Sequence, residues 1–167
     1  CTHCYVDAGK NQGDTLNSKE FSSIIDEFAG IHKTKVIFTG GETLLYRDFF
    51  KLADRAKKND LKVFLFTNGT LINSQMVEKL EEYVDEIQFS LDGATASIND
   101  LIRGEGVYHK VFDSIRLLRN TKIKQKLAIV LMPQNVEDFR ENVEELAKSL
   151  EHIEMKFGFV ITEGRAD

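Results

Sequence analysis

Two cysteines with a C-x-x-C spacing, Cys1 and Cys4, open the chain. Such a pair can bind zinc, act as a redox dithiol, or form the trailing half of an iron–sulfur motif whose first cysteine lies before residue 1. An N-terminal cysteine exposed by processing can also act as a nucleophile. Zinc requires two further ligands, and the histidines are scattered without ligand spacing. A thioredoxin-like dithiol requires a nearby proline, and the sole proline, Pro133, lies far along the chain. The pair alone leaves these chemistries open.

Polar residues that could bind a ligand or take part in a reaction also follow several hydrophobic runs. Turns and helix caps by themselves call for Gly, Asn and Thr at such positions. They do not explain why the acids Glu42 and Asp92 follow a glycine or a serine. The paired glycines Gly40 and Gly41 allow a backbone to approach a ligand closely, because neither has a Cβ. No dinucleotide or P-loop glycine pattern follows any of these runs. The segments are Thr39-Gly40-Gly41-Glu42, Thr67-Asn68-Gly69-Thr70, Ser90-Leu91-Asp92-Gly93, Pro133-Gln134-Asn135 and Thr162-Glu163-Gly164-Arg165.

The elements that position these residues alternate between strand and helix. The runs are rich in Val, Ile and Phe, and their nearly continuous apolar character predicts strands buried on both faces. The segments between them have apolar residues at helical spacing, and Asn17 or Ser18 is available to cap the first helix. Strands alternating with helices predict βαβ units and a parallel sheet. The expected strands are 35–38, 62–66, 86–89, 127–131 and 155–161, and the expected helices are centred on 21–28, 49–56, 77–84, 111–118 and 139–150.

The length decides between a closed and an incomplete barrel. An eight-unit barrel requires about 250 residues, whereas this chain has 167. A helix leads into the first expected strand, so we expect a further strand before Cys1 and six in all. The fold class is therefore α/β, as a partial (βα)6-type parallel barrel with its first strand missing. Residues 1–167 form one core domain, a fragment of a longer chain. The polar loops should gather at one rim, because the carboxyl ends of parallel strands share an edge.

Composition restricts the partners. The chain is 42% hydrophobic and 29% charged, with a net charge of −5, which excludes a disordered chain. No apolar stretch is long enough to span a membrane. Without basic runs, we expect no nucleic-acid partner and no membrane partner. Two cysteines do not make a disulfide scaffold, and no signal peptide is visible, so we expect a cytoplasmic protein.

Several motifs together resemble the radical S-adenosylmethionine (radical SAM) superfamily. Cys1-Thr2-His3-Cys4-Tyr5 resembles the end of its C-x-x-x-C-x-x-C signature, and Thr39 to Leu45 resembles its Gly-Gly-Glu segment. Further segments are similar to the subgroup of peptide maturases with a C-terminal SPASM domain. The match extends over almost the whole chain, with the motifs in the expected order. The further segments are Thr67-Asn68-Gly69-Thr70-Leu71, Ser90-Leu91-Asp92-Gly93, Ile102-Arg103-Gly104 and Gly164-Arg165-Ala166.

This resemblance implies both cofactors and the residues that bind them. Cys1 and Cys4 would ligate a [4Fe–4S] cluster, whose open iron chelates S-adenosylmethionine. Gly40, Gly41 and Glu42 would meet the amino group of S-adenosylmethionine. Its ribose and methionine part would lie near Asn68, Ser90 and Asp92, and Arg103 would pair with its carboxylate. Alternatively, Asp92 is a turn or cap acid and Arg103 a solvated residue at a helix start. His3 and Tyr5 would pack against the cluster or belong to the core. No residue of the chain is assigned to the catalytic step itself.

The resemblance also implies a reaction class. Cleavage of S-adenosylmethionine gives a 5′-deoxyadenosyl radical that abstracts hydrogen from a substrate, and the cofactors supply that chemistry. We expect an oxidoreductase or maturase acting on a peptide or protein, with a flavodoxin- or ferredoxin-type reducing partner. The alternatives are a radical SAM enzyme of small-molecule cofactor biosynthesis and a non-catalytic barrel that binds S-adenosylmethionine or a peptide. The first cluster cysteine and the SPASM cysteines are absent from the sequence, so the fragment alone is expected to be inactive.

Overall fold

A computed structural model describes residues 1–4, 9, 16–31 and 34–159. Five strands form one parallel sheet in the sequential order β1-β2-β3-β4-β5. The prediction of a parallel α/β sheet is confirmed. Within the described residues β1 and β5 are the two edges, so the sheet is a partial barrel that does not close. The strands are β1 (Lys35–Phe38), β2 (Lys62–Thr67), β3 (Glu86–Ser90), β4 (Lys124–Leu131) and β5 (Glu154–Phe159).

The helices lie between the strands along the chain. Asn17 caps α1, because its Oδ1 accepts from the backbone N–H groups of Lys19 and Glu20 at 2.9 and 3.2 Å. The carboxylate of Glu20 accepts in turn from the Asn17 N–H, which completes a capping box. The helices are α1 (Ser18–Ile31), α2 (Phe49–Lys58), α3 (Val77–Tyr83), α4 (Ala96–Arg103), α5 (Val107–Leu117) and α6 (Val136–Ser149), with short 3-10 turns η1 (Thr43–Leu45) and η2 (Ser74–Met76).

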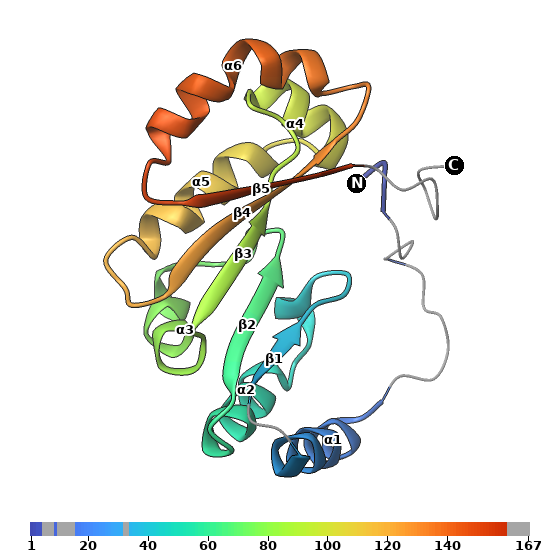
Figure 1. Ribbon diagram of the computed structural model, residues 1–167, viewed down its shortest axis with the longest axis vertical. Coiled ribbons are helices and arrows are strands. Elements are labelled where there is room, and N and C mark those ends of the chain that lie inside the picture. The colour runs from blue at the N-terminus through green and yellow to red at the C-terminus, as the bar shows by residue number, and fades with distance from the viewer. Residues whose placement is uncertain (5–8, 10–15, 32–33, 160–167) are drawn as a thin grey trace.

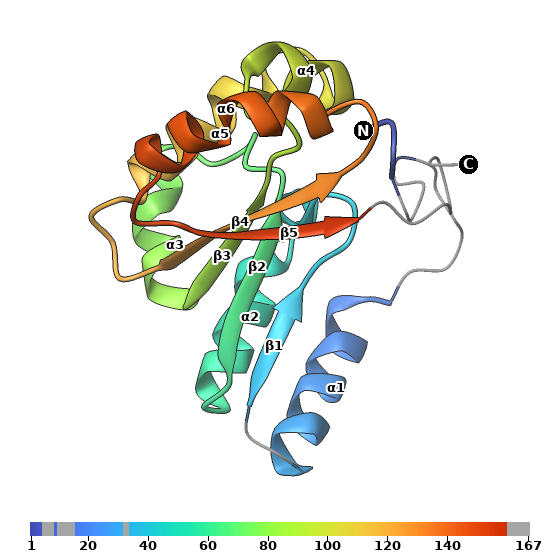
Figure 2. The same ribbon diagram turned by 45° about the horizontal axis from the view of Figure 1, so that its top comes forward.

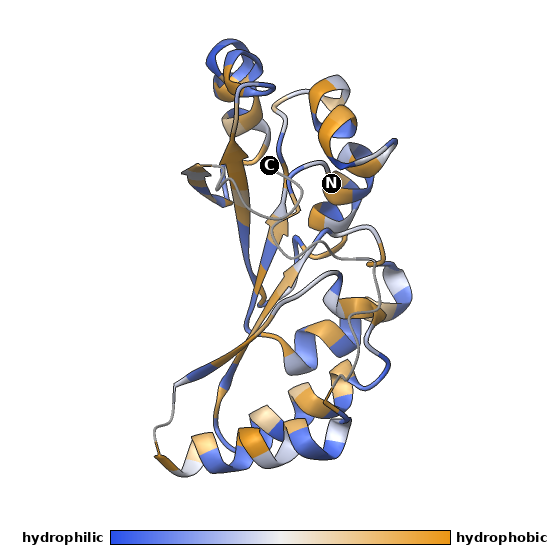
Figure 3. Ribbon diagram, turned by 90° about the vertical axis from the view of Figure 1, so that its right-hand side faces the viewer, coloured by the Kyte–Doolittle hydropathy of each residue, from blue (hydrophilic) through white to orange (hydrophobic). Residues whose placement is uncertain are grey.

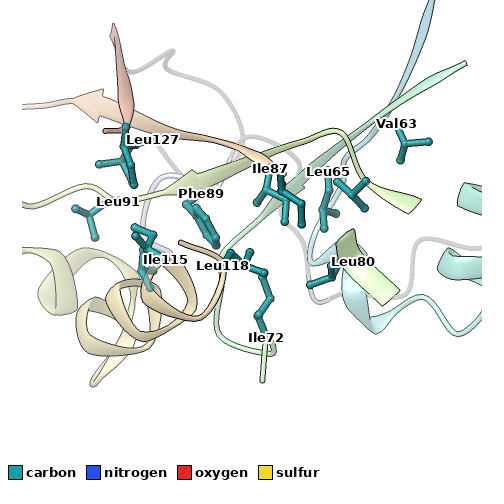
Figure 4. Close-up of a cluster of buried hydrophobic side chains, with 14 of the residues drawn as sticks. Val63, Leu65, Ile72, Leu80, Ile87, Phe89, Leu91, Ile115, Leu118 and Leu127 are labelled. Atoms are coloured by element: carbon teal, nitrogen blue, oxygen red, sulfur yellow. The ribbon is translucent and has the colours of Figure 1, made fainter. Parts of the chain in front are cut away.

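Helices α2 to α6 cover one face of the twisted sheet, and α1 lies beside the β1 edge (Figures 1 and 2). The hydrophobic core fills the space between that face and the helices. Alternate residues of the central strands point into it, and Figure 4 shows Ile115 and Leu118 packed near Ile87 and Phe89. All four of these side chains are buried. This packing places the carboxyl ends of β1 to β5 on one rim, as expected.

The other face of the sheet differs from the prediction of strands buried on both sides. In β2, Val63, Leu65 and Thr67 are buried, whereas Phe64 and Phe66 are half-buried. The same alternation runs through β4, and most of β5 is exposed. Continuous apolar character therefore does not mean burial on both faces here. The physical reason is that the second face lines the concave side of an incomplete barrel, where only part of each side chain is covered. Figure 3 shows apolar and polar segments intermixed along the strands.

One helix was missing from the sequence prediction. Residues 96–103 form α4, although we expected Arg103 in a loop or at a helix start. Arg103 is instead the last residue of α4, and Gly104 and Gly106 then turn the chain at φ values of 114° and 74°. No helix among the described residues is long and apolar enough to cross a membrane. Tyr5, residues 160–161 of the last expected strand, and the segment Gly164-Arg165-Ala166 lie outside the described residues.

Candidate cofactor site

The C-x-x-C segment lies against the carboxyl end of α4. The Thr2 N–H donates to the Ile102 carbonyl at 3.1 Å. Arg103 Nη1 donates to Cys1 Sγ at 3.7 Å. Cys1 is exposed and Cys4 is half-buried. The N-terminal end of the chain therefore lies at the rim where the strands end (Figure 1), which is where ligands bind in parallel α/β sheets.

Asp92, two residues beyond β3, is the centre of a buried polar cluster. Its side chain is fully buried. Asp92 Oδ1 accepts from the Val130 N–H at 2.8 Å. Asp92 Oδ2 lies 2.6 Å from Arg103 Nη2 and 3.0 Å from His3 Nε2. Neither contact meets hydrogen-bond geometry at Oδ2, so Arg103 pairs with Asp92 through its charge and His3 only lies close to the carboxylate. The cluster thus joins the C-x-x-C segment to β3, β4 and α4.

The electrostatics of this cluster favour a charged carboxylate. Burial raises the pKa of Asp92, but the contact with His3, the charge of Arg103 and the Val130 N–H outweigh it, so the net pKa is lowered. For Arg103, burial lowers the pKa and the neighbouring Asp92 offsets this only in part. Guanidinium groups stay protonated in proteins, so Arg103 remains a cation. Asp92 and Arg103 therefore form a buried ion pair.

Two buried nitrogen atoms of this cluster have no hydrogen-bond partner. They are His3 Nδ1 and Arg103 Nε. Unsatisfied buried polar atoms are rare in native proteins and often mark a ligand or ion site. Among the described residues, no group of three or more His, Cys, Asp or Glu side chains gathers to hold a metal ion. The two thiols of the C-x-x-C segment are the kind of side chain that ligates iron–sulfur clusters.

A second polar cluster connects the loops after β1 and β2. Glu42 Oε1 accepts from Thr67 Oγ1 at 2.8 Å and from the Leu44 N–H at 3.0 Å. Its other oxygen, Oε2, accepts from the Asn68 N–H at 2.8 Å. These three donors occupy the carboxylate of Glu42, which therefore holds the two loops together. The side of this segment left for a ligand is the glycine backbone before Glu42.

The glycine pair borders a groove. Gly40 has φ of 148°, and a Cβ added there would meet nothing within 4 Å. Gly40, Gly41 and Glu42 line a groove of about 680 Å³ between β1 and the apolar face of α1, which contributes Phe21 and Phe28. The other four expected cofactor residues, Asn68, Ser90, Asp92 and Arg103, do not line it. The expected residues therefore lie at the rim in two groups, Gly40 to Glu42 at this groove and the other four outside it.

Asn68 and Ser90 lie between these two groups along the sheet. Asn68 Oδ1 accepts from the N–H of Thr70 at 2.9 Å and from its hydroxyl at 2.7 Å, so it shapes its own turn. Ser90 is half-buried and is the last residue of β3. It pairs with Ala128 in the register of β3 and β4. Its side chain lies on the concave face, opposite the buried Phe89.

Two supporting residues had not been singled out for a role. Asn99 is fully buried on α4, and its Oδ1 accepts from the Asp92 N–H at 3.0 Å. Asn135 is fully buried and donates from Nδ2 to the carbonyls of Asp92 and Val130 at 2.9 and 2.8 Å. In the sequence, Asn99 is only a polar residue in a segment after Asp92 for which no helix or strand is predicted. Asn135 is only one of the polar residues that follow an expected strand.

The fold is an α/β partial barrel with the C-x-x-C segment and a buried ion pair at its carboxyl rim. Comparison with known proteins identifies the class. Residues 1–146 match the family model "Radical SAM superfamily", and the chain belongs to that superfamily. Its members are enzymes that use a [4Fe–4S] cluster and S-adenosylmethionine.

Two curated relatives and one solved structure show the range of similarity. The chain is 34% identical over 144 residues to mycofactocin maturase MftC of Mycolicibacterium smegmatis, covering 84% of this chain and 36% of the relative. It is 32% identical over 170 residues to the AdoMet-dependent heme synthase of Methanosarcina barkeri, covering 100% of this chain and 48% of the relative. The solved structure of native anSMEcpe with bound AdoMet superposes with a TM-score of 0.82 at 20% identity, covering 96% of this chain and 48% of that chain. The chain thus spans less than half the length of these proteins.

Proposed function

We propose that this chain is the cofactor-binding core of a radical SAM enzyme that modifies a peptide or protein. The observation that supports the cofactor assignment is the contact of Cys1 with Arg103 at the carboxyl rim, next to the buried Asp92. The similarity to a mycofactocin maturase supports the peptide substrate. When bound, the cluster and S-adenosylmethionine supply an electron and a hydrogen-abstracting organic radical. This chain's residues bind and orient those groups.

In this proposal, each group of residues has a separate task. Cys1 and Cys4 ligate iron. The backbone of Gly40 and Gly41 receives the amino group of S-adenosylmethionine, and Glu42 keeps that backbone in place through the loop after β2. Asn68 and Ser90, at the ends of β2 and β3, face the ribose and methionine part.

Arg103 supplies the positive charge for the S-adenosylmethionine carboxylate. Its Nε is buried and lacks a hydrogen-bond partner. Arg103→Ala should weaken S-adenosylmethionine binding by about 1.5–3 kcal/mol, the range for a hydrogen bond to a charged group. Isothermal titration of cluster-loaded full-length enzyme under anaerobic conditions measures this change. Wild-type affinity in the variant would reject the carboxylate assignment and leave the fold unaffected.

The proposal is tested on the full-length protein, reconstituted anaerobically with iron and sulfide. With a reductant and S-adenosylmethionine it should release 5′-deoxyadenosine, detected by liquid chromatography and mass spectrometry. Replacing Cys4 by Ala should abolish both the brown absorbance and this product, since one cluster ligand is lost. A Cys4→Ala variant that retains both would contradict the proposal.

A second candidate is a porphyrin-modifying enzyme. It is favoured by the match to AdoMet-dependent heme synthase, which extends over the whole chain. The two candidates differ in what stimulates cofactor cleavage. If the first candidate is right, a peptide substrate should increase 5′-deoxyadenosine release and change in mass. If the second candidate is right, an iron porphyrin should have this effect instead. Release that responds to neither, together with intact S-adenosylmethionine binding, would favour a binding domain.

A further inference from the structure

Asp92 has no surface left for a ligand. Its side chain is fully buried, Oδ1 is occupied by the Val130 N–H, and Oδ2 faces both Arg103 and His3. The resemblance places this acid near the ribose or methionine part of S-adenosylmethionine. Direct contact would require moving a buried ion pair. The geometry therefore calls for a different role for Asp92.

Three separate elements hold Asp92 in one position. Its carboxylate accepts from Val130 of β4, and its own N–H donates to Asn99 of α4. Its carbonyl accepts from Asn135, the residue before α6. Gly93 follows, and a Cβ there would come within 2.2 Å of the Asn99 nitrogen, so α4 sits directly against this turn. Asp92 is thus an anchored point in the β3–α4 connection.

From this anchor, contacts lead outward to the cysteine segment. Asp92 Oδ2 lies 2.6 Å from Arg103 Nη2, and Arg103 Nη1 donates to Cys1 Sγ at 3.7 Å. Asp92 also contacts His3, the residue between Thr2 and Cys4, at 3.0 Å. The Thr2 N–H donates to the Ile102 carbonyl next to Arg103. Every one of these links fixes residues 1–4 relative to the end of α4.

We infer that Asp92 is a positioning residue for the cluster-binding segment, holding His3 directly and aiming the Arg103 guanidinium at the sulfur of Cys1. This inference rests on the proposed function, because it concerns how the chain presents its thiolates to iron. It assigns Arg103 a contact to a cluster ligand in addition to its proposed contact with S-adenosylmethionine. The guanidinium has separate nitrogens for the two tasks, since Nη1 faces Cys1 and Nε is unpartnered.

Two physical effects follow from this arrangement. Residues that orient metal ligands typically contribute 10- to 100-fold to metal affinity. A positive N–H donor at a cluster sulfur stabilises the more negative, reduced cluster, and hydrogen bonds to sulfur are among the determinants of cluster potential. Removing the donor should therefore make the cluster potential more negative. A purely structural role for the ion pair would change stability and leave the potential of a loaded cluster unchanged.

The first test measures iron affinity in the full-length protein. Asp92→Asn keeps the size of the side chain and an oxygen for the Val130 N–H, and it loses the charge that holds Arg103 and His3. We expect iron affinity to fall by about 10- to 100-fold in a chelator competition assay. Asp85→Asn is the matched control. Asp85 also accepts from a backbone N–H, that of Val63, and pairs with Lys57, but it directly precedes β3 and so lies at the opposite end of that strand. Its iron affinity should match the wild type.

The second test measures the cluster potential by EPR-monitored redox titration without S-adenosylmethionine. Arg103→Met should shift the potential to more negative values, because a cation near Cys1 is lost. Arg103→Lys keeps that charge, so the cluster potential of this variant should stay close to the wild-type value. Combining Arg103→Met with Asp92→Asn should add little to the loss of iron affinity, because both changes break one chain of contacts.

The outcomes separate this inference from the proposed function. If the wild-type full-length protein binds no cluster, the proposed function fails. If the wild type binds a cluster and cleaves S-adenosylmethionine, the inference alone is overturned by Asp92→Asn with wild-type iron affinity or Arg103→Met with an unchanged potential. Thermal unfolding of each apoprotein shows whether a variant is folded. If Asp92→Asn is unfolded, the potentials of Arg103→Met and Arg103→Lys test the inference on their own.

Discussion

Gly93 shows that a residue within a family motif can be fixed by packing rather than by a ligand. It directly follows Asp92, and a Cβ at this position would lie 2.2 Å from the Asn99 backbone nitrogen and 2.7 Å from its Cα. Because the neighbouring atoms belong to the backbone, no change of rotamer relieves the clash. A larger residue must therefore displace α4 from the β3–α4 turn.

Gly93→Ala should destabilise the protein by about 1–3 kcal/mol, the usual cost of overpacking. Urea unfolding followed by circular dichroism measures this change. Gly30→Ala is the control, because Gly30 lies in α1 with nothing within 4 Å of an added Cβ. Alanine favours a helix by about 0.5–1 kcal/mol over glycine, so this variant should be slightly more stable. Equal stability of Gly93→Ala and the wild type would contradict the packing argument.

Asp92 should also make the free energy of unfolding depend on pH. Its folded-state pKa lies below the ordinary carboxyl value of 3.8. The charged carboxylate thus stabilises the folded state at neutral pH, and this contribution is lost as pH falls below about 4 through the folded-state pKa. Unfolding free energies measured between about pH 7 and pH 3 should therefore decline less steeply in Asp92→Asn than in the wild type. Parallel curves for the two proteins would show that the Asp92 ion pair does not contribute.

At the scale of elements, α4 depends on contacts from a distant part of the chain. Asp138 of α6 accepts from the N–H groups of Ala94 and Thr95 at 2.6 and 3.2 Å, and from the Thr95 hydroxyl at 2.7 Å. Ala94 and Thr95 directly precede α4, so Asp138 fixes the turn that leads into this helix. At its other end, α4 carries Arg103, so the contact with Asp138 also supports the contact with Cys1.

Asp138→Ala should cost about 1–3 kcal/mol, because it leaves the Ala94 and Thr95 N–H groups without their acceptor. Faster hydrogen exchange should appear first in the amides of α4, as measured by mass spectrometry. Glu137→Ala is the control, because Glu137 is adjacent in sequence but pairs with Arg140 on the exposed face of α6. If exchange in α4 were equally slow in both variants, Asp138 would not hold the start of this helix.

At the scale of the whole molecule, stability should be greatest in the centre of the sheet. β3 is paired on both sides, by β2 and β4, and carries the fully buried Ile87 and Phe89. β5 is an edge strand on which Phe159 is 84% exposed, and Ile37 of the other edge strand is 41% exposed. Buried contacts and paired strands set the free energy of local opening.

Amide exchange in residues 1–167 should therefore be slowest in β3 and its neighbours, and faster in β1 and β5. The measurement is native-state hydrogen exchange resolved to single residues. A β5 as protected as β3 would contradict this ranking.

The sequence by itself determined the strands, most of the helices and the parallel order. Those features arise from local periodicity, such as the apolar residues of β2 and α5, which any short window of the chain contains. It also determined which loops reach the carboxyl rim, because the direction of parallel strands follows from their alternation with helices. The helix α4 was missed, since the side chain that holds the turn before it is Asp138, more than 40 residues away.

Only the tertiary structure decided how the site residues are grouped. Glu42 is committed to Thr67 and Asn68, and Asp92 to Arg103 and His3, so acids that look equivalent in the sequence hold together different loops. Cys1 and Arg103 are 102 positions apart. Which distant side chains meet depends on the twist of the sheet and the packing of α4, and the exposure of the concave face depends on how far the barrel closes. No local pattern contains that information, because it exists only once the chain has folded.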